Sequence, residues 1–423
     1  MKPAIAQPAT SSNYRWIICA LLFFATVIAY VDRGVLGYLE KYLEGIFHFD
    51  SVQYSYMTTA FQIAYAIGMV TAGWLTDRLG TRKGFALAIT LWSLAAMTPG
   101  AATGVWTFCF AMFFLGIGEA ANFPACNKTV AEWFPKKERA LAFGIFNSGA
   151  NIGNMAVPVL VPALVFGVGW RGAFVTAGSL GLVWLCFWLW LYRKPEEHRK
   201  VSGRELAHIQ SDPPEKTGKV PWARILPVKE TWAFAVAKML TDPIWWFYLF
   251  WLPRYLQETF HLSISTNRTP VIAVYLISCV GSISGGWLSS TMLGRGRSLN
   301  ASRKTALLIC ALMVLPVLYA PFATSLWVVV ALVGLAAAGH QGWSANLFTL
   351  ASDLFPKTAV GSVTGFGGMA GAIAGAGFQL ATGYIVRWTN SYVPLFIIAG
   401  LAYVTALLVI QILSPKLAPA KLD

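Results

Sequence analysis

Two residues of opposite charge, Asp32 and Arg33, stand side by side inside an apolar stretch about as long as a bilayer is thick. A charge at the bilayer centre costs roughly 2.5–3.5 kcal/mol on insertion scales, so such residues usually face a water-filled path or a partner. Neighbouring positions on a helix do not face each other, so the two side chains are expected to serve different neighbours. The pattern indicates either side chains that reach a membrane surface or a solute path with an anion-binding arginine and a titratable acid.

Glu119 lies near the middle of another apolar stretch. A carboxyl group in poorly solvated surroundings can take up and release a proton near neutral pH. The alternative is a hydrogen-bond acceptor between helices. Glu119 is therefore a candidate proton carrier.

Lys238 and Asp242 are four residues apart in a third apolar stretch, so they can pair on one face of a helix. Pro243 removes one backbone hydrogen bond and invites a kink at that point. Trp245 and Trp246 follow directly, and they form either an aromatic wall for a ligand or ordinary packing against lipid and neighbouring helices.

Further polar side chains fall inside apolar stretches, where each can bind either a hydroxyl group of a ligand or another helix. An interhelical hydrogen bond is worth about 0.6 kcal/mol on average, so both interpretations stay open. The set comprises Tyr30, Tyr65, Asn147, Asn151, His340, Gln341, Trp343, Ser344, Asn346 and Gln379.

The composition indicates which elements position these residues. The chain has 423 residues, of which 57% are hydrophobic and 12% charged, and its mean hydropathy is +0.59, which is too apolar for a soluble protein. Several stretches exceed the ~18 apolar residues that indicate a membrane helix, and the alternation typical of a β-barrel is absent. The six cysteines show no metal-ligand spacing. The sequence predicts an all-α protein in the lipid bilayer, with no metal site.

Twelve transmembrane helices are expected, six on each side of a long polar stretch. This division predicts an N-terminal six-helix bundle (1–192), a cytoplasmic linker (193–230) and a C-terminal six-helix bundle (231–423), with a short amphipathic helix around Ser202–Gln210 in the linker. The spans are placed at approximately 15–38, 52–75, 84–102, 105–131, 141–167, 171–192, 231–253, 268–292, 303–321, 325–350, 360–386 and 391–413.

The net charge of +14 fits membrane orientation better than a nucleic-acid partner, because the basic residues are distributed unevenly. Most of the 32 Lys and Arg residues fall on the side of both termini and the linker. The positive-inside rule then places both termini and the linker in the cytoplasm. The exceptions are Lys41, Arg171, Arg254, Arg268 and Arg387 on the opposite side, and Arg33, Lys128 and Lys238 within spans.

The two halves also contain matching sequence motifs. Glu132-Trp-Phe-Pro-Lys136 after the fourth span matches Asp353-Leu-Phe-Pro-Lys357 after the tenth. Two related halves that hold a substrate between them are typical of alternating-access transporters.

The stretch after the second span reads Gly73-Trp-Leu-Thr-Asp77-Arg78-Leu-Gly80-Thr-Arg82-Lys83. It resembles the signature loop of the major facilitator superfamily, and the resemblance covers nearly the whole chain. It implies two pseudo-symmetric six-helix bundles and a cytoplasmic gate formed by Gly73, Asp77, Arg78, Gly80 and Arg82. In such a gate, Asp77 can lie by the positive end of a helix in the other half, while the arginines pair with carboxylates.

Three stretches resemble the hexuronate transporters of the anion:cation symporter branch, namely Tyr30–Arg33, Lys238–Pro253 and Gly339–Phe348. This resemblance implies inward movement of sugar acids such as galacturonate and glucuronate with protons. It assigns proton coupling to Asp32 and Glu119 and the substrate carboxylate to Arg33. Related carriers often have an arginine where this chain has Met112, so Glu119 is expected to lack that ion pair.

The sequence thus predicts a proton-coupled hexuronate symporter of the bacterial inner membrane, functional as a monomer and without a cofactor other than protons. Substrate contacts are expected from the polar set above together with Lys238, Asp242, Trp245 and Trp246. An aldonate or a dicarboxylate as substrate stays open, as does a nutrient sensor on the same scaffold. An enzyme is disfavoured because no Ser/His/Asp order, HExxH motif or phosphate loop appears.

Overall fold

The computed structural model describes residues 12–211, 221–355 and 357–420, without the side chains of residues 70, 72–77, 136–137, 139–141 and 357–358. Every regular element in this part of the chain is a helix, so the predicted all-α membrane class is confirmed. The α-helices are α1 (Tyr14–Phe47), α2 (Ser51–Met97), α3 (Val105–Glu119), α4 (Asn122–Trp133), α5 (Lys136–Leu191), α6 (Gly203–Ile209), α7 (Trp222–Ile225), α8 (Lys229–Phe260), α9 (Arg268–Gly294), α10 (Leu299–Val314), α11 (Leu326–Leu354), α12 (Lys357–Thr389) and α13 (Val393–Leu413). The 3-10 helices are η1 (Thr98–Ala101), η2 (Pro195–Glu197) and η3 (Leu315–Phe322).

Two of the long helices each combine two predicted spans. The second and third spans join in α2, which kinks at Gly80 with φ 75° and ψ 159°. The fifth and sixth spans join in α5, which kinks at Gly169 with φ 74° and ψ 169°. Because a β-carbon disfavours positive φ, glycine lets the chain change direction sharply at a single residue.

The fourth predicted span is instead divided into α3 and α4, directly after Glu119. Pro124 has no N–H to donate to the carbonyl of Ala120, so the ladder of helical hydrogen bonds is interrupted there. Ala120 and Ala121 form a turn between the two helices. The candidate proton carrier therefore lies at the C-terminal end of a helix.

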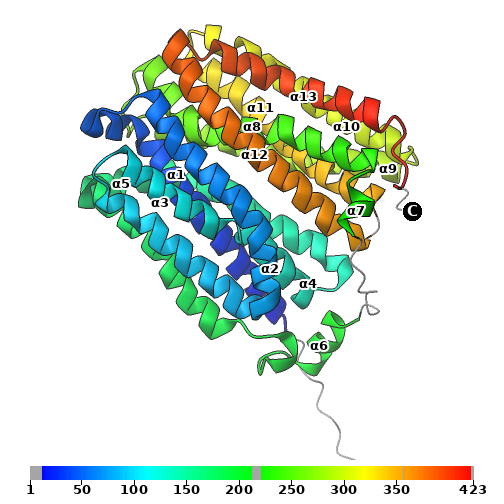
Figure 1. The fold of residues 1–423 in the computed structure, drawn as a ribbon. Coiled ribbons are helices and arrows are strands. Elements are labelled where there is room, and N and C mark those ends of the chain that lie inside the picture. Colours follow the sequence, from blue (N-terminus) through cyan, green and yellow to red (C-terminus); the bar gives the residue numbers. More distant parts are fainter. Residues whose placement is uncertain (1–11, 212–220, 356, 421–423) are drawn as a thin grey trace, which may run out of the picture.

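The helices fall into two groups, which we call the N-half (α1–α5) and the C-half (α8–α13) (Figure 1). They meet where α12 packs along α2, α5 against α9, and α1 against α8. We call the end of the bundle near α6, α7 and Ala420 the linker end, and the opposite end, near His48 and His261, the loop end.

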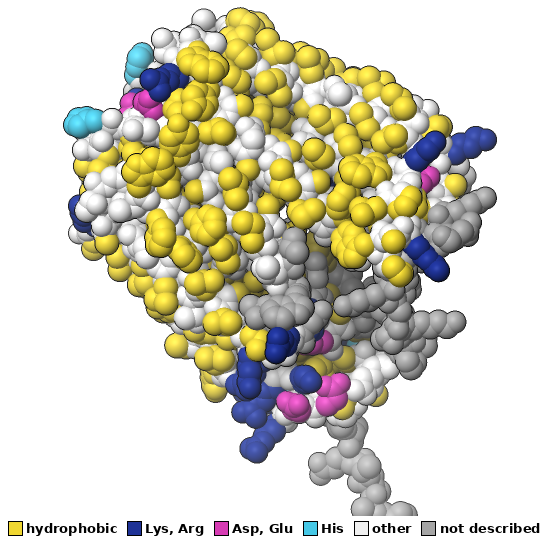
Figure 2. All heavy atoms as spheres, viewed as in Figure 1, with side chains coloured by type: hydrophobic (Ala, Val, Ile, Leu, Met, Phe, Trp, Pro, Cys, Tyr) yellow, Lys and Arg dark blue, Asp and Glu magenta, His cyan; other side chains and the backbone are white. Residues whose placement is uncertain are grey.

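The surface of the bundle suits a bilayer. Figure 2 shows hydrophobic side chains over its flank and a group of Lys and Arg at the end that carries α6. Nine helical segments of the described part are long and apolar enough to cross a membrane. One of them, Ala142–Leu191, is divided at Gly169 and is long enough to cross twice. The chain is a multi-pass membrane protein.

A row of glycines on α12 packs against a row of functional candidates on α8. Both rows repeat every four residues, which keeps each on one helix face. A β-carbon at Gly371 would collide with the Asp242 carboxylate, so glycine at this position makes room for the acid. Gly375 faces Trp246 one turn further along, and Gly367 lies mainly against the Phe234 ring, with the Lys238 side chain somewhat farther away.

The short linker helix predicted around Ser202–Gln210 is present as α6, with the Ser202 side chain capping its first turn. This helix docks onto the start of α1 through Glu205. Its carboxylate accepts hydrogen bonds from the Ser12 hydroxyl and from the backbone amides of Tyr14 and Arg15, each at 3.1 Å from the amide nitrogen. The Arg15 guanidinium lies 3.2 Å from the same carboxylate.

Burial by itself raises the pKa of Glu205, but the hydrogen bonds from Ser12 and from the two amides outweigh it and hold the pKa below its usual range. A carboxyl group whose pKa is lowered by docking stabilises the docked state above the pKa of the undocked group. That stabilisation is lost as the pH falls through the lower pKa of the docked state.

We predict that Glu205→Ala releases α6 from α1 at neutral pH, because hydrogen bonds to a charged group contribute about 1.5–3 kcal/mol each. Amide hydrogen exchange measured at one pH should show faster exchange over 203–209 in the variant. Glu197→Ala, at an exposed glutamate of the same segment, is the matched control and should leave exchange unchanged. Equal protection in both variants would show that Glu205 does not hold the helix.

Candidate functional site

The central feature of the site is an ion pair between α1 and α3. Arg33 Nε donates a hydrogen bond to Glu119 Oε2 at 2.8 Å, and Arg33 Nη2 lies 2.6 Å from the same oxygen in the ion pair. Both side chains are almost fully buried, at 1% and 0% exposure. Met112 is also buried in α3, but the absence of an arginine there does not leave Glu119 unpaired, because Arg33 takes that role.

Four aromatic rings surround the Arg33 guanidinium. Its central carbon lies 4.2 Å from the ring centre of Tyr30, 5.3 Å from Trp246, 5.5 Å from Phe61 and 5.7 Å from Tyr65. A cation within about 6 Å of an aromatic ring is attracted to its face. Since Trp246 belongs to α8, the arginine lies where the two halves meet.

Asp32, next to Arg33 on α1, is not bonded to either member of this pair. The side chain is buried, and neither carboxylate oxygen has a hydrogen-bond partner among the described residues. The second oxygen of Glu119, Oε1, is in the same situation. An ionised carboxylate that is buried without compensation is very costly, so a bound proton is the favourable state for Asp32, whereas the charge of Glu119 is compensated by Arg33.

The predicted pair on α8 is present. Lys238 Nζ lies 2.8 Å and 3.1 Å from the two carboxylate oxygens of Asp242. The side chain of Asp242 keeps 19% of its surface exposed and that of Lys238 7%, although both are in the middle of a helix bundle. Asp242 lies one helical turn before Trp246 on α8, and the Trp246 ring contacts the Arg33 guanidinium. The pair therefore borders the same region as Arg33.

His340 of α11 packs against Trp245 of α8 within the C-half. Their rings are stacked with centres 5.0 Å apart and planes 10° apart. His340 Nδ1 lies 2.6 Å from the Tyr403 hydroxyl. Trp343 is fully buried and meets the Tyr403 ring edge-on. Tyr403 of α13 thus holds both His340 and Trp343 in place. Through His340 it also supports the position of Trp245.

The remaining polar candidates divide into three groups. Gln341 donates to Asn151 Oδ1 at 3.1 Å, a contact between the halves. Gln379 and Asn346 instead bond inside the C-half, where Gln379 accepts from the Trp251 indole at 2.6 Å and Asn346 donates to the carbonyls of Gly285 and Gly342. Asn147 and Ser344 are half-buried, and no side-chain hydrogen bond in the described part of the chain ties them to Arg33.

Sequence reasoning missed three residues of this region: Phe61, Gln62 and Tyr403. Gln62 is buried against Gly375, and neither atom of its amide has a hydrogen-bond partner among the described residues. The signal that singled out Gln379, an uncharged polar residue within a span, applies equally to Gln62 and Tyr403.

The predicted gate residues lie at the linker end. Gly73 and Asp77 are among the residues whose side chains are not described. Gly80 forms the kink of α2, Arg78 is exposed, and Arg82 bonds to the Leu189 carbonyl within its own half. The gate stays a prediction.

At the loop end, a network of charged side chains joins the halves. Arg254 of α8 bonds to Glu40 and lies 3.2 Å from Glu44, both of α1, and 2.9 Å from Glu258 of its own helix. Arg254 and Glu40 are buried. Lys41 lies 3.0 Å from Glu44 and 3.1 Å from Glu258. These ion pairs close the loop end.

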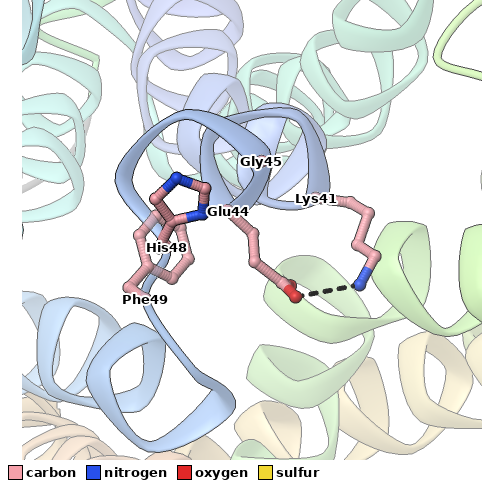
Figure 3. A pocket seen from close by; sticks show the side chains of 5 residues that line it. All are labelled: Lys41, Glu44, Gly45, His48 and Phe49. Atoms are coloured by element: carbon pink, nitrogen blue, oxygen red, sulfur yellow. Dashed lines mark hydrogen bonds and ion pairs between the residues drawn. The ribbon is translucent and has the colours of Figure 1, made fainter.

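A surface hollow of about 450 Å³ lies beside this network (Figure 3). It is lined by Lys41, Glu44, Gly45, His48 and Phe49, and Figure 3 shows the Lys41 and Glu44 side chains pointing toward each other. Lys41 is eight residues beyond Arg33 on the same helix, or roughly 12 Å along its axis. The hollow is therefore separate from the site around Arg33.

Membrane helices in two halves, with buried charged and aromatic residues where the halves meet, are typical of membrane transporters. The chain belongs to the Major Facilitator Superfamily, whose family model matches residues 22–377. It is accordingly a transporter and not an enzyme.

Individual proteins support this assignment. The hexuronate transporter of Escherichia coli (strain K12) is 30% identical over 407 residues, which cover 94% of this chain and 93% of that protein. The probable galactarate/D-glucarate transporter of Bacillus subtilis (strain 168) is 29% identical over 423 residues, covering 96% and 93%. The crystal structure of a D-xylose–proton symporter has a TM-score of 0.73 at 15% identity and covers 96% of this chain and 98% of that one. This last similarity concerns the fold alone.

We predict that Arg254→Gln opens the loop end, because removing one partner of a buried ion pair costs about 3–5 kcal/mol. A cysteine introduced at Ser51, whose hydroxyl bonds across the halves to the Gly383 carbonyl, reports the opening. With the six native cysteines replaced, its reaction rate with a maleimide should rise at least tenfold. Lys41→Gln, at the more exposed cation of the network, is the control and should have a much smaller effect. An unchanged rate in the Arg254 variant would contradict the assigned role.

Proposed function

We propose that this protein is a proton-coupled symporter that imports a hexuronate, such as galacturonate or glucuronate, by alternating access. The observation that carries the proposal is the Arg33–Glu119 pair, a cation and an acid held together where the N-half meets α8. The similarity to a hexuronate transporter over 94% of the chain supports the choice of substrate class.

The groups around Arg33 suit a sugar acid. The guanidinium offers a fork of donors that matches a carboxylate, and Glu119 can yield it by taking up a proton. The faces of Trp245 and Trp246 suit the C–H surface of a sugar. Asn151 and Gln341, which bond to each other between the halves, can exchange that bond for hydroxyl groups of the substrate.

The negative charge of the substrate is a reason for coupling its transport to protons. An anion that enters a negative-inside cell moves uphill electrically, at about 2.3 kcal/mol per charge per 100 mV. One co-transported proton cancels this cost, and further protons drive accumulation. Glu119 and Asp32 are the carboxyl groups we assign to proton uptake, because each has a buried oxygen without a partner among the described residues.

We further propose that the protein lies in the bacterial inner membrane with the linker end in the cytoplasm. The uneven distribution of Lys and Arg in the sequence supports this orientation. Residues 1–192 and 231–423 then act as the two moving bundles, and 193–230 connects them on the cytoplasmic side. One chain contains both halves, so a monomer is sufficient for transport.

The test is uptake of labelled galacturonate by purified protein in liposomes. An inward proton gradient should stimulate uptake, and glucuronate but not neutral galactose should compete. Arg33→Ala should abolish binding, because the carboxylate loses its cation. Arg171→Ala, at an exposed arginine of the N-half, is the matched control and should transport normally. Undiminished binding by the Arg33 variant would refute the site, and binding without uptake would favour a sensor.

We predict that Glu119→Gln uncouples transport from protons. An amide cannot take up the proton, so galacturonate exchange across the membrane should persist while accumulation driven by a proton gradient falls at least tenfold. Exchange and accumulation are measured in the same liposomes, with Glu197→Gln in the linker as the control. Normal accumulation by the Glu119 variant would remove this residue from the coupling scheme.

A further inference from the structure

The network of ion pairs at the loop end contains more carboxylates than cations. Its members are Glu40, Glu44, Glu258, Arg254 and Lys41. With all five ionised, three carboxylates face two cations, and one negative charge is left over. We propose that Glu40 is a further proton-binding site of this protein, separate from Asp32 and Glu119, and that it takes up a proton when the loop end closes.

Glu40 is the member of the network that water does not reach. Its side chain is fully buried, whereas those of Glu44 and Glu258 keep 27% and 24% of their surface exposed. These two carboxylates also share Lys41, at 3.0 Å and 3.1 Å. Because an ionised carboxylate is costly where neither water nor a cation of its own compensates it, the surplus charge is least stable at Glu40.

The contacts of Glu40 leave one oxygen free for a proton. Oε1 accepts from Arg254, but that guanidinium is shared, since it also bonds to Glu258 and lies 3.2 Å from Glu44. Oε2 is buried and has no hydrogen-bond partner in the described part of the chain. A protonated carboxyl group still accepts hydrogen bonds. A proton on Oε2 therefore removes the surplus charge and keeps the bond of Oε1 to Arg254.

The other groups packed around the network do not supply the missing charge. The Tyr54 hydroxyl of α2 donates to a backbone carbonyl of α8 at 2.8 Å, and the Tyr392 hydroxyl donates to Glu258 at 2.7 Å. A phenol carries no positive charge, so neither tyrosine balances a carboxylate. Arg387 and Asp50, which also connect the halves at this end, lie 3.3 Å apart and balance each other.

The hollow at the loop end brings water close to Glu40. Lys41 and Glu44 belong both to the network and to the lining of the hollow, which His48 and Phe49 complete on one side (Figure 3). Glu44 follows Glu40 by four residues, or about 6 Å along the axis of α1. Protons from bulk water therefore need to pass only one helical turn to reach the buried carboxyl group.

Closure of the loop end then depends on pH in a defined direction. When the halves separate there, Glu40 becomes hydrated and releases its proton, as an ordinary glutamate does at neutral pH. Since only the closed state holds the proton, the ratio of closed to open protein rises as the pH falls, by up to about tenfold per pH unit. The proton returns to the side from which it came. Glu40 therefore sets how closure responds to pH and adds nothing to the number of protons transported.

The experiment measures the distance across the loop end as the pH changes. Spin labels are attached to cysteines at Thr103 of the N-half and Thr266 of the C-half, both exposed, after replacement of the six native cysteines. The full-length protein is held in lipid nanodiscs, so one buffer reaches both ends. Pulsed electron paramagnetic resonance gives the ratio of closed to open protein, which should rise as the pH falls from about 8 to 5.

Variants assign this response to Glu40. Glu40→Gln, a neutral side chain of the same size, should make the ratio independent of pH. Glu44→Gln leaves two carboxylates with two cations, so closure should need a roughly tenfold higher proton concentration. Asp50→Asn, at the balanced pair of the same end, is the matched control and should respond as the wild type does.

Three results would overturn the proposal. One is a wild-type ratio that does not change with pH. Another is a response that survives in Glu40→Gln or, where that variant does not fold, a Glu44→Gln protein that closes at the wild-type pH. The third is a response that disappears when Asp32→Asn and Glu119→Gln are combined, since it would then belong to the central site. Uptake of labelled galacturonate tests the proposed function separately.

Discussion

The structure depends on holding two opposite charges in surroundings that solvate neither of them. Arg33 and Glu119 come from different helices and are both buried, so the positions of α1 and α3 are tied to each other. Packing supports the same arrangement. A β-carbon at Gly116 would collide with the carbonyl of Phe61, and one at Gly118 would lie 2.8 Å from the backbone nitrogen of Trp92. Close approach of α3 to α2 and the ion pair therefore specify one position for Glu119.

Charges at the loop end serve another purpose, because there they connect the two halves. Arg254 and Glu40 lie on opposite sides of the contact between α8 and α1. When such a contact separates, hydration of the exposed charges offsets much of the lost attraction. A contact made of ion pairs and hydrogen bonds, such as that of the Tyr54 hydroxyl to the Phe250 carbonyl at 2.8 Å, can therefore form and break more readily than an apolar interface of equal size.

The sequence was sufficient for the fold class, since hydropathy and span length are properties of composition. It also predicted the Lys238–Asp242 pair, because four-residue spacing fixes the geometry within one helix. It did not predict that Arg33 pairs with Glu119, which is 86 residues away, or that Arg254 pairs with Glu40, 214 residues away. Helix periodicity says which face a residue occupies, but not which helix that face meets.

The apolar pattern of the sequence also did not predict the breaks and kinks in the helices. Gly80 lies in the predicted loop after the second span, and Gly169 lies between the fifth and sixth predicted spans, yet each allows two spans to follow one another almost directly. Pro124, which divides the fourth span after Glu119, exerts its effect four residues upstream through a hydrogen bond it cannot make. A pattern of apolar residues does not register such effects on the backbone.

The glycine row of α12 has a consequence for how this chain can change during evolution. Since Gly371 is opposite Asp242, any side chain at position 371 needs a smaller residue or a different rotamer at position 242. The two positions should therefore vary together among descendants of this protein. A lineage that loses the acid at 242 becomes free to lose the glycine, and the reverse order of substitutions is the less accessible one.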